Sequence, residues 1–218
     1  MTELAASTYP PDTRLPEIKL SGHLDATFPY ILSHLEYIIG ELLRNSIQAV
    51  VESQKASKTP RTEVPPIEVT VCEAPQHVII RVSDQGGGIP RDILPHLWSF
   101  SKGPRSSQRL QNLYQVPKMA ATLQELKISD DLNSLESSTP PQDTPGEVHH
   151  SSLSSLSVRP PNLKLGMGLP LSRVYAEYWA GNLEVHSLEG YGVDAFLTIS
   201  KLGNKNEQLT MRASMDAV

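Results

Sequence analysis

The sequence predicts an α/β protein in which helices cover one face of a mixed, mostly antiparallel sheet. Apolar residues recur at three- and four-residue spacing over residues 26–55, which is typical of a long amphipathic helix. Elsewhere they alternate with polar residues in short runs, which is typical of half-buried strands. Together these two patterns predict a two-layer sandwich, and we find no internal repeat.

The first half of the chain carries one helix and a strand pair. Residues 1–20 are proline-rich and extended, with a short strand at 17–20. The apolar stripe of the helix over 26–55 comprises Ile31, Leu35, Ile38, Leu42 and Ala49. Residues 67–83 alternate as two strands around a turn at 73–76.

A long insert separates the two halves of the predicted domain. The chain is dominated by Ser, Thr and Pro between residues 134 and 161. A segment this long and polar inside a domain is typical of a lid or of disorder. We therefore predict one domain over 21–203, with a largely disordered lid at 104–162 and a polar tail at 204–218.

The second half carries a helix and two further strands. Gly166 and Gly168 form a turn before a helix over 169–180, which ends before Gly181. We expect its buried stripe to contain Leu171, Val174, Tyr175 and Tyr178. Alternation over 183–188 and 193–200 predicts two strands joined by a glycine-containing turn.

Composition excludes several classes of function. The net charge of −5 over 218 residues argues against a general nucleic-acid-binding protein. A single cysteine, Cys72, excludes an intramolecular disulfide and a cysteine-rich zinc site. No apolar stretch approaches the roughly 20 residues that a membrane span needs, so we expect none.

Glu41 and Asn45 are the first candidate functional pair. They lie four residues apart on the predicted helix and therefore share a face. Asn45 continues the apolar series, so we expect it to point toward the buried side. A carboxylate and an amide together suit a magnesium ion and a water molecule. The plain alternative is a solvated glutamate and a core asparagine bonded to backbone.

Two glycine-containing segments are the other candidates. Asp84 ends a strand and precedes Gly86 and Gly88, so its carboxylate suits an exocyclic amine such as that of adenine. The alternative is an Asx turn. Gly166 and Gly168 precede a helix, whose N-terminal N–H groups suit phosphate. Glycine turns also occur there for packing alone.

The order of these motifs resembles the GHKL superfamily of ATP-binding domains, which share the Bergerat fold. Three runs are also similar to the mitochondrial protein kinases, the family of pyruvate dehydrogenase kinase and branched-chain α-ketoacid dehydrogenase kinase. They are ELLRNSIQA at 41–49, SDQGGGI at 83–89 and GMGLPLSRVYAEY at 166–178. SLEGYGVD at 187–194 extends the similarity, which covers about 26–103 and 163–202.

The resemblance implies a role for each motif residue. Glu41 would be the general base for a serine hydroxyl, and Asn45 would ligate magnesium. Asp84 would bind the adenine amino group. The remaining nucleotide contacts implied are Gly86, Gly88, Ser101, Lys102, Gly166, Met167, Gly168 and Leu169.

The same resemblance implies cofactors and partners. It implies ATP and Mg²⁺, with K⁺ as an option, and phosphorylation that inactivates a 2-oxoacid dehydrogenase complex in the mitochondrial matrix. The decarboxylase subunit would be the substrate and the lipoyl-bearing acyltransferase core the dock, with homodimers an option. Family members carry an N-terminal helical bundle and a presequence, so we expect this chain to match the C-terminal half.

Alternatives and departures remain. The alternatives are an ATP-binding regulatory module without catalysis, and a histidine-kinase-like or ATPase GHKL domain. Tyr37 resembles the branched-chain enzymes, because pyruvate dehydrogenase kinases typically carry His there. Lys164 replaces the first glycine of the family's Gly-x-Gly-x-Gly, Gln48 replaces a common arginine, and Val193 replaces a usual threonine.

Overall fold

The computed structural model describes residues 9–11, 13–56, 63–100, 103, 106–107 and 164–203. Its elements in chain order are β1 (Ile18–Gly22), α2 (Leu32–Ala56), β2 (Ile67–Glu73), β3 (His77–Asp84), η1 (Leu94–His96), α6 (Gly168–Tyr178), β4 (Asn182–Leu188) and β5 (Gly192–Ser200). The α/β class predicted from the sequence is confirmed, as are its two long helices and the strands that follow them. No described helix is long and apolar enough to span a membrane.

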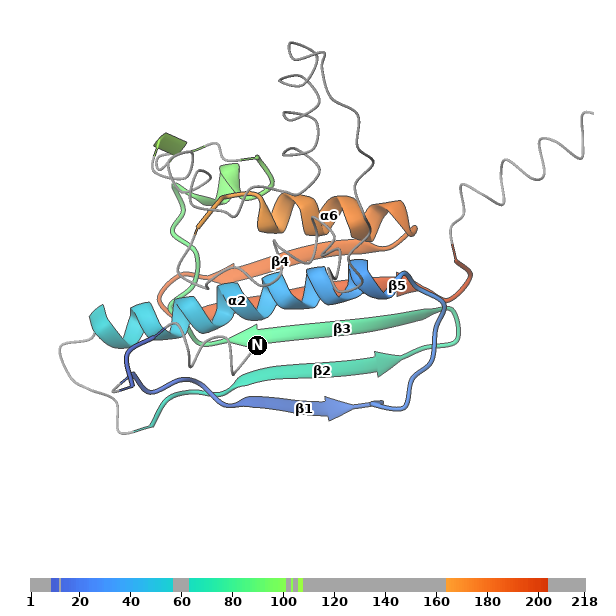
Figure 1. The fold of residues 1–218 in the computed structure, drawn as a ribbon, viewed down its shortest axis with the longest axis horizontal. Coiled ribbons are helices and arrows are strands. Elements are labelled where there is room, and N and C mark those ends of the chain that lie inside the picture. Colours follow the sequence, from blue (N-terminus) through green and yellow to red (C-terminus); the bar gives the residue numbers. More distant parts are fainter. Residues whose placement is uncertain are drawn as a thin grey trace, which may run out of the picture.

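The five strands form one sheet in the order β1-β2-β3-β5-β4 (Figure 1). Only β1 and β2 are parallel, with Ile18 opposite Ile67. The other neighbours are antiparallel, and Asp84 at the end of β3 lies opposite Val193 at the start of β5. Because β1 pairs from Ile18, the boundary expected at residue 20 falls inside this strand.

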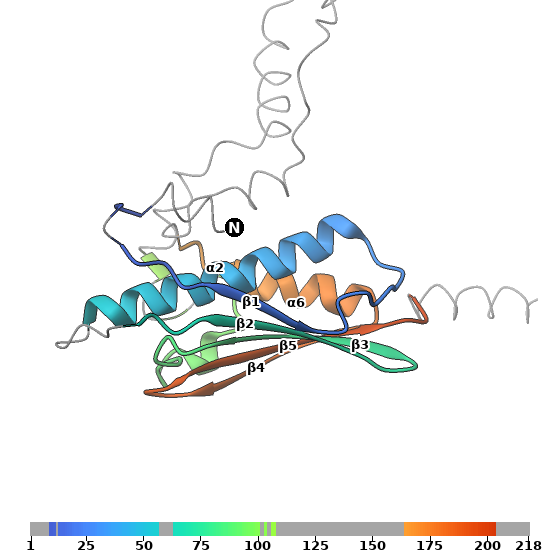
Figure 2. The same cartoon turned by 90° about the horizontal axis from the view of Figure 1, so that it is seen from below.

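Both helices lie on one face of the sheet (Figure 2). The residues of β3 alternate strictly between buried and half-buried, so one side of this central strand faces the helices. Burying apolar side chains between helices and sheet is the main favourable term for such a fold. The buried core of this layer comprises Ile38, Leu42, Leu43, Ile47, Val51, Ile67, Val69, Val78, Ile80, Val82, Ala176, Leu183, Ala195, Leu197 and Ile199.

Helix α2 begins later than the periodicity predicts. Its first residue is Leu32, whereas the pattern predicts a helix from residue 26. Pro29 argues against a helix that runs on from residue 26, because proline disfavours helical backbone at the residue before it. The preceding segment is fastened to α6 instead, since Trp179 Nε1 donates to the carbonyl of Pro29 at 2.9 Å.

The face that α6 buries is also different from the predicted one. Val174 and Tyr178 were expected in its buried stripe, but they are 48% and 52% exposed. Ser172 and Ala176 are fully buried instead. Small residues allow the helix to approach the sheet and α2 closely, so apolar character alone does not identify the packed face.

The helix α6 also ends differently from the prediction. The helix stops at Tyr178, and the residue with left-handed backbone is Ala180, at φ 53°, rather than a glycine. Gly181 serves close packing instead, because a Cβ there would lie 2.4 Å from the carbonyl oxygen of Thr198. Two predicted regions, the tail at 204–218 and the lid at 104–162 apart from Ser106 and Ser107, lie outside the described residues.

Candidate functional site

A cavity of about 140 Å³ opens between α2, the segment around η1 and the N-terminus of α6. Five residues predicted from the sequence line it, namely Glu41, Asn45, Gly166, Gly168 and Leu169. The other lining residues are Arg44, Gln48, Ile93, His96, Leu97, Ser99, Lys164, Leu165 and Pro170. Tertiary folding thus brings together two of the three predicted motifs, which are more than a hundred residues apart in sequence.

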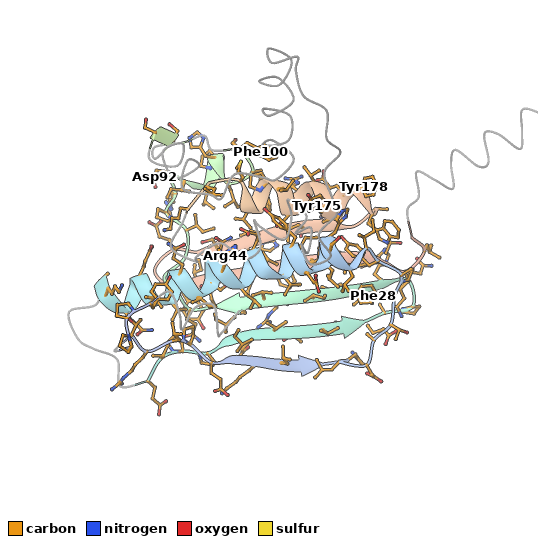
Figure 3. All side chains as sticks on the ribbon, in the orientation of Figure 1. Phe28, Arg44, Asp92, Phe100, Tyr175 and Tyr178 are labelled. Atoms are coloured by element: carbon orange, nitrogen blue, oxygen red, sulfur yellow. The ribbon has the colours of Figure 1, made fainter. Side chains whose placement is uncertain are left out.

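Glu41 is almost completely enclosed at the base of this cavity. Its side chain is 2% exposed, and its Oε1 accepts a hydrogen bond from Arg44 Nη1 at 2.6 Å. Arg44, labelled on α2 in Figure 3, is itself only 2% exposed. A buried carboxylate needs such compensation, because leaving a buried charge without a partner is very costly. The expected base is therefore held in one orientation by a neighbour on the next turn.

The N-terminus of α6 packs directly against the Glu41 carboxylate. A Cβ built on Gly168 would lie 2.0 Å from Glu41 Oε2, so only glycine fits there without displacing the side chain. The first N–H groups of a helix have no intrahelical partner and carry partial positive charge. Gly166, with φ +70°, turns the chain into this position. At the start of α6, backbone N–H groups are therefore available to an anion, and the glycines let the anion approach the backbone closely.

Asn45 is placed differently from the expectation. The prediction that it points toward the buried side is wrong, because Asn45 is exposed and lines the cavity. The plain alternative of a solvated Glu41 is equally wrong. The start of α6 covers the Glu41 side chain, as the close approach of Gly168 indicates, whereas Asn45 lies beyond this contact. One turn later, the amide of Asn45 is accessible to a ligand.

Asp84 lies at the carboxyl end of β3, beside α2 but outside the lining of this cavity. It is 5% exposed. Ser46 Oγ donates to Asp84 Oδ2 at 2.8 Å, and the Gly86 amide donates to Oδ1 at 2.9 Å. The second bond is the Asx turn that the sequence left as an alternative. Burial raises the pKa of the Asp84 carboxyl, and these hydrogen bonds oppose that rise.

The glycines after Asp84 fit a tightly packed loop. A Cβ on Gly86 would lie 2.4 Å from Ala49 Cβ, and one on Gly88 would lie 2.4 Å from the carbonyl oxygen of Leu188. The Gly190 amide donates to the carbonyl of Gly87 at 2.8 Å, so the loop is tied to the turn between β4 and β5. Close packing therefore explains why residues 86 and 88 are glycines. The same loop also places the Gly86 amide next to the Asp84 carboxylate.

The remaining predicted positions divide into two groups. Met167 packs against the small cluster of Tyr37 and Leu165 and does not line the cavity. Ser101 and Lys102 lie outside the described residues.

In the described ranges no group of three or more His, Cys, Asp and Glu residues could hold a metal ion alone. A magnesium ion would therefore need oxygens from a ligand besides Asn45, which is how Mg²⁺ binds in many phosphate sites.

Several cavity residues were missed from the sequence. Arg44 lies three residues after Glu41, a spacing that places both side chains together on a helix and was an available signal. The wall formed by Ile93, His96 and Leu97 could not be found this way, because η1 has no apolar periodicity. Glu52, which lies outside the cavity lining, was missed as well; it accepts a hydrogen bond from Lys164 Nζ at 2.9 Å.

Comparison with known proteins agrees with this geometry. The family model described as "Histidine kinase-, DNA gyrase B-, and HSP90-like ATPase" matches residues 31–202. These bounds include α2, the Asp84 loop and the N-terminus of α6, which carry Glu41, Asn45, Asp84, Gly166 and Gly168 or adjoin them.

Individual relatives are mitochondrial kinases. The chain is 34% identical, over 89% of its length, to the mitochondrial pyruvate dehydrogenase (acetyl-transferring) kinase of Arabidopsis thaliana, and covers 42% of that protein. It is 31% identical, over 93% of its length, to kinase 2 of the same name from Saccharomyces cerevisiae, covering 45% of it. For isozyme 4 from Homo sapiens these values are 28%, 88% and 36%.

The chain therefore spans less than half the length of these three curated relatives. The resemblance to mitochondrial protein kinases inferred from the motifs is confirmed by these matches. With its five-stranded sheet, its one-sided helical layer and its matched residues 31–202, the chain belongs to the family of histidine kinase-, DNA gyrase B- and HSP90-like ATPases.

Proposed function

We propose that this chain is the ATP-binding catalytic domain of a protein serine kinase that acts on a 2-oxoacid dehydrogenase complex. One observation carries the proposal. Glu41 and Asn45 line a single cavity together with the glycine-led N-terminus of α6. This arrangement sets a potential base, a metal-binding amide and a phosphate-binding backbone within one site.

The chain's own residues would divide the work of phosphoryl transfer, a reaction that depends mainly on positioning and electrostatics. Asp84 would accept a hydrogen bond from the adenine amino group, because its two oxygens retain acceptor capacity beyond Ser46 and Gly86. The amides at Gly168 and Leu169 would bind phosphate oxygens. Glu41 would take the proton of the serine hydroxyl, with Arg44 orienting its carboxylate.

Asn45 is the residue that would hold Mg²⁺, through its side-chain oxygen. When bound, the ion neutralises charge on the phosphate oxygens. The donor set fits, because an exposed amide beside a phosphate-binding segment leaves the remaining coordination positions to phosphates and water. K⁺ is a further candidate cofactor, and Ser101 and Lys102 remain candidate phosphate contacts.

The substrate class comes from the relatives. The three relatives compared above are all named as mitochondrial pyruvate dehydrogenase (acetyl-transferring) kinases. We propose the same compartment and a decarboxylase subunit as substrate. Tyr37 favours a branched-chain substrate instead, because at this position the sequence resembles the branched-chain enzymes.

The test compares the intact chain with two isosteric variants. Asp84→Asn should abolish MgATP binding in calorimetry, because an amide NH₂ group repels the adenine amine. Glu41→Gln should bind MgATP but transfer phosphate to purified decarboxylase subunits at least about 100-fold more slowly. Subunits of the pyruvate and branched-chain complexes are assayed side by side. Undiminished transfer by Glu41→Gln would exclude Glu41 as the base.

The second candidate function is an ATP-binding module that regulates a partner without transferring phosphate. The enclosure of Glu41, at 2% exposure and with Oε1 engaged by Arg44, favours it, because a substrate hydroxyl must still reach this carboxylate. Asp84-dependent ATP binding without transfer to either subunit would select this function over the kinase.

A further inference from the structure

Lys164 joins the phosphate-binding segment to α2 through a carboxylate that lies outside the cavity lining. Its ammonium donates to both oxygens of Glu52, at 2.9 Å and 3.2 Å. Gln48 Nε2 donates to the same Glu52 oxygen, Oε1, at 3.1 Å. Lys164 and Gln48 both line the cavity, whereas Glu52 does not. The ammonium of Lys164, in the lining of the proposed ligand site, is thus bound to a carboxylate just outside that lining.

The strength of this link differs greatly from that of the other ion pair at the cavity. The side chains of Lys164 and Glu52 are 39% and 56% exposed, whereas those of Glu41 and Arg44 are 2% exposed. Exposed pairs contribute little because water screens them, and they exchange partners readily. The Glu41–Arg44 pair is therefore enclosed by the protein, whereas the Lys164–Glu52 pair is open to water and can exchange partners.

The position of Lys164 indicates which partner its ammonium would exchange Glu52 for. The residue lies two positions before Gly166, on the segment that leads into α6. A nucleotide phosphate bound at this segment carries more negative charge than one carboxylate, so it attracts the ammonium more strongly. When Lys164 leaves, Gln48 still donates to Glu52, so the released carboxylate keeps a partner.

We propose that Glu52 competes with the phosphate groups of bound nucleotide for the ammonium of Lys164. Lys164 is held by Glu52 in the free protein and becomes a phosphate ligand when nucleotide binds. The inference rests on the proposed nucleotide-binding function and adds to it a phosphate contact, with a carboxylate that weakens affinity by restraining that contact.

The test is a double-mutant cycle on MgATP affinity, measured by calorimetry on the intact chain. Lys164→Gln should weaken binding about fivefold, because a charge-assisted phosphate contact is lost. Glu52→Gln should tighten it about threefold, because the ammonium no longer has a competing carboxylate. The double variant should match Lys164→Gln, because Glu52 is proposed to affect MgATP affinity through Lys164. Adenosine, which has no phosphate, should bind all four proteins equally.

Matched controls remove the same charges elsewhere. Lys19→Gln on β1 and Glu68→Gln on β2 alter exposed ion pairs that do not line the cavity, so MgATP affinity should not change. The inference is overturned if Lys164→Gln binds MgATP like the wild type, or if Glu52→Gln acts equally with and without Lys164. In either case MgATP binding that depends on Asp84 would still support the proposed nucleotide-binding function. Failure of the folded wild type to bind any nucleotide would overturn the proposed function as well.

Discussion

Asp84 shows how a single residue can be tuned by its surroundings. Its carboxylate is 5% exposed and receives hydrogen bonds from Ser46 and the Gly86 amide. Burial nevertheless dominates and raises its pKa above the ordinary value of 3.8. Folding therefore favours the protonated form, and keeping this carboxylate charged at neutral pH costs stability. A perturbed pKa of this kind is common at functional sites, which fits the adenine-binding role proposed for Asp84.

Asp84→Asn should be at least as stable as the wild type near neutral pH. A raised folded-state pKa contributes stability that is fully present below 3.8 and is lost as pH rises through the folded value. The amide of Asn has no charge to desolvate. Asp84→Asn should therefore have the higher free energy of unfolding at neutral pH, where Asp84 is charged, and lose this advantage at low pH, where Asp84 is protonated. Urea denaturation at about pH 7 and about pH 3.5 measures the free energy of unfolding under both conditions.

The surface control for this prediction is Asp25→Asn, which neutralises an exposed carboxylate. It should leave the free energy of unfolding within about 0.5 kcal/mol of the wild type at both pH values. If Asp84→Asn instead proves less stable than the wild type at neutral pH, its hydrogen bonds outweigh the cost of burying the charge.

At the scale of elements, the contact between α2 and α6 decides the shape of the site. Gly168 at the start of α6 touches the Glu41 carboxylate, and a separate cluster around Tyr37 and Leu165 packs alongside. Farther along, His34 of α2 stacks on Tyr175 of α6 with ring centroids 4.3 Å apart. The two helices therefore hold Glu41, the proposed base, and the proposed phosphate-binding segment as one unit.

Two glycine substitutions should act in opposite directions. Gly168→Ala places a Cβ 2.0 Å from Glu41 Oε2, so it should lower the free energy of unfolding by about 1–3 kcal/mol and weaken MgATP binding. Gly40→Ala, within α2, meets nothing within 4 Å and should raise stability by about 0.5–1 kcal/mol. Chemical denaturation and calorimetry on both variants measure these effects. Equal stability changes in the two variants would contradict the close contact.

At the scale of the whole molecule, the sheet acts as a platform with its helices on one face (Figure 2). The proposed adenine contact at the end of β3 and the proposed phosphate contacts on α6 come from segments far apart in sequence, yet both adjoin α2. A ligand that touches both segments would therefore stabilise the native state as a unit, because neither contact exists in the unfolded chain.

MgATP should raise the thermal midpoint of unfolding of the wild type. At a concentration of about 100 times Kd, binding to the native state alone adds about 2.7 kcal/mol. Differential scanning fluorimetry measures this shift, with adenosine as the reference for the contribution of the phosphates. Asp84→Asn should show no shift at the same concentration, and a shift equal to that of the wild type would contradict the adenine role of Asp84.

The sequence by itself determined the class of fold and the identity of most candidate site residues. Strand alternation depends on a local period of two residues, so β3 could be recognised without its partners. The motifs around Glu41, Asp84 and Gly166 could be recognised because each is contiguous and they occur in a fixed order. Local patterns of this kind survive without knowledge of long-range contacts.

Only the tertiary structure decided which side chains are enclosed and which remain accessible. Periodicity placed Asn45 on the buried side and Val174 in a packed stripe, yet both are exposed. A helix in this fold contacts the sheet beneath it and another helix beside it, so the face it buries depends on both neighbours. The link between Lys164 and Glu52 spans 112 residues and leaves no local signal, because only folding brings those two charges together.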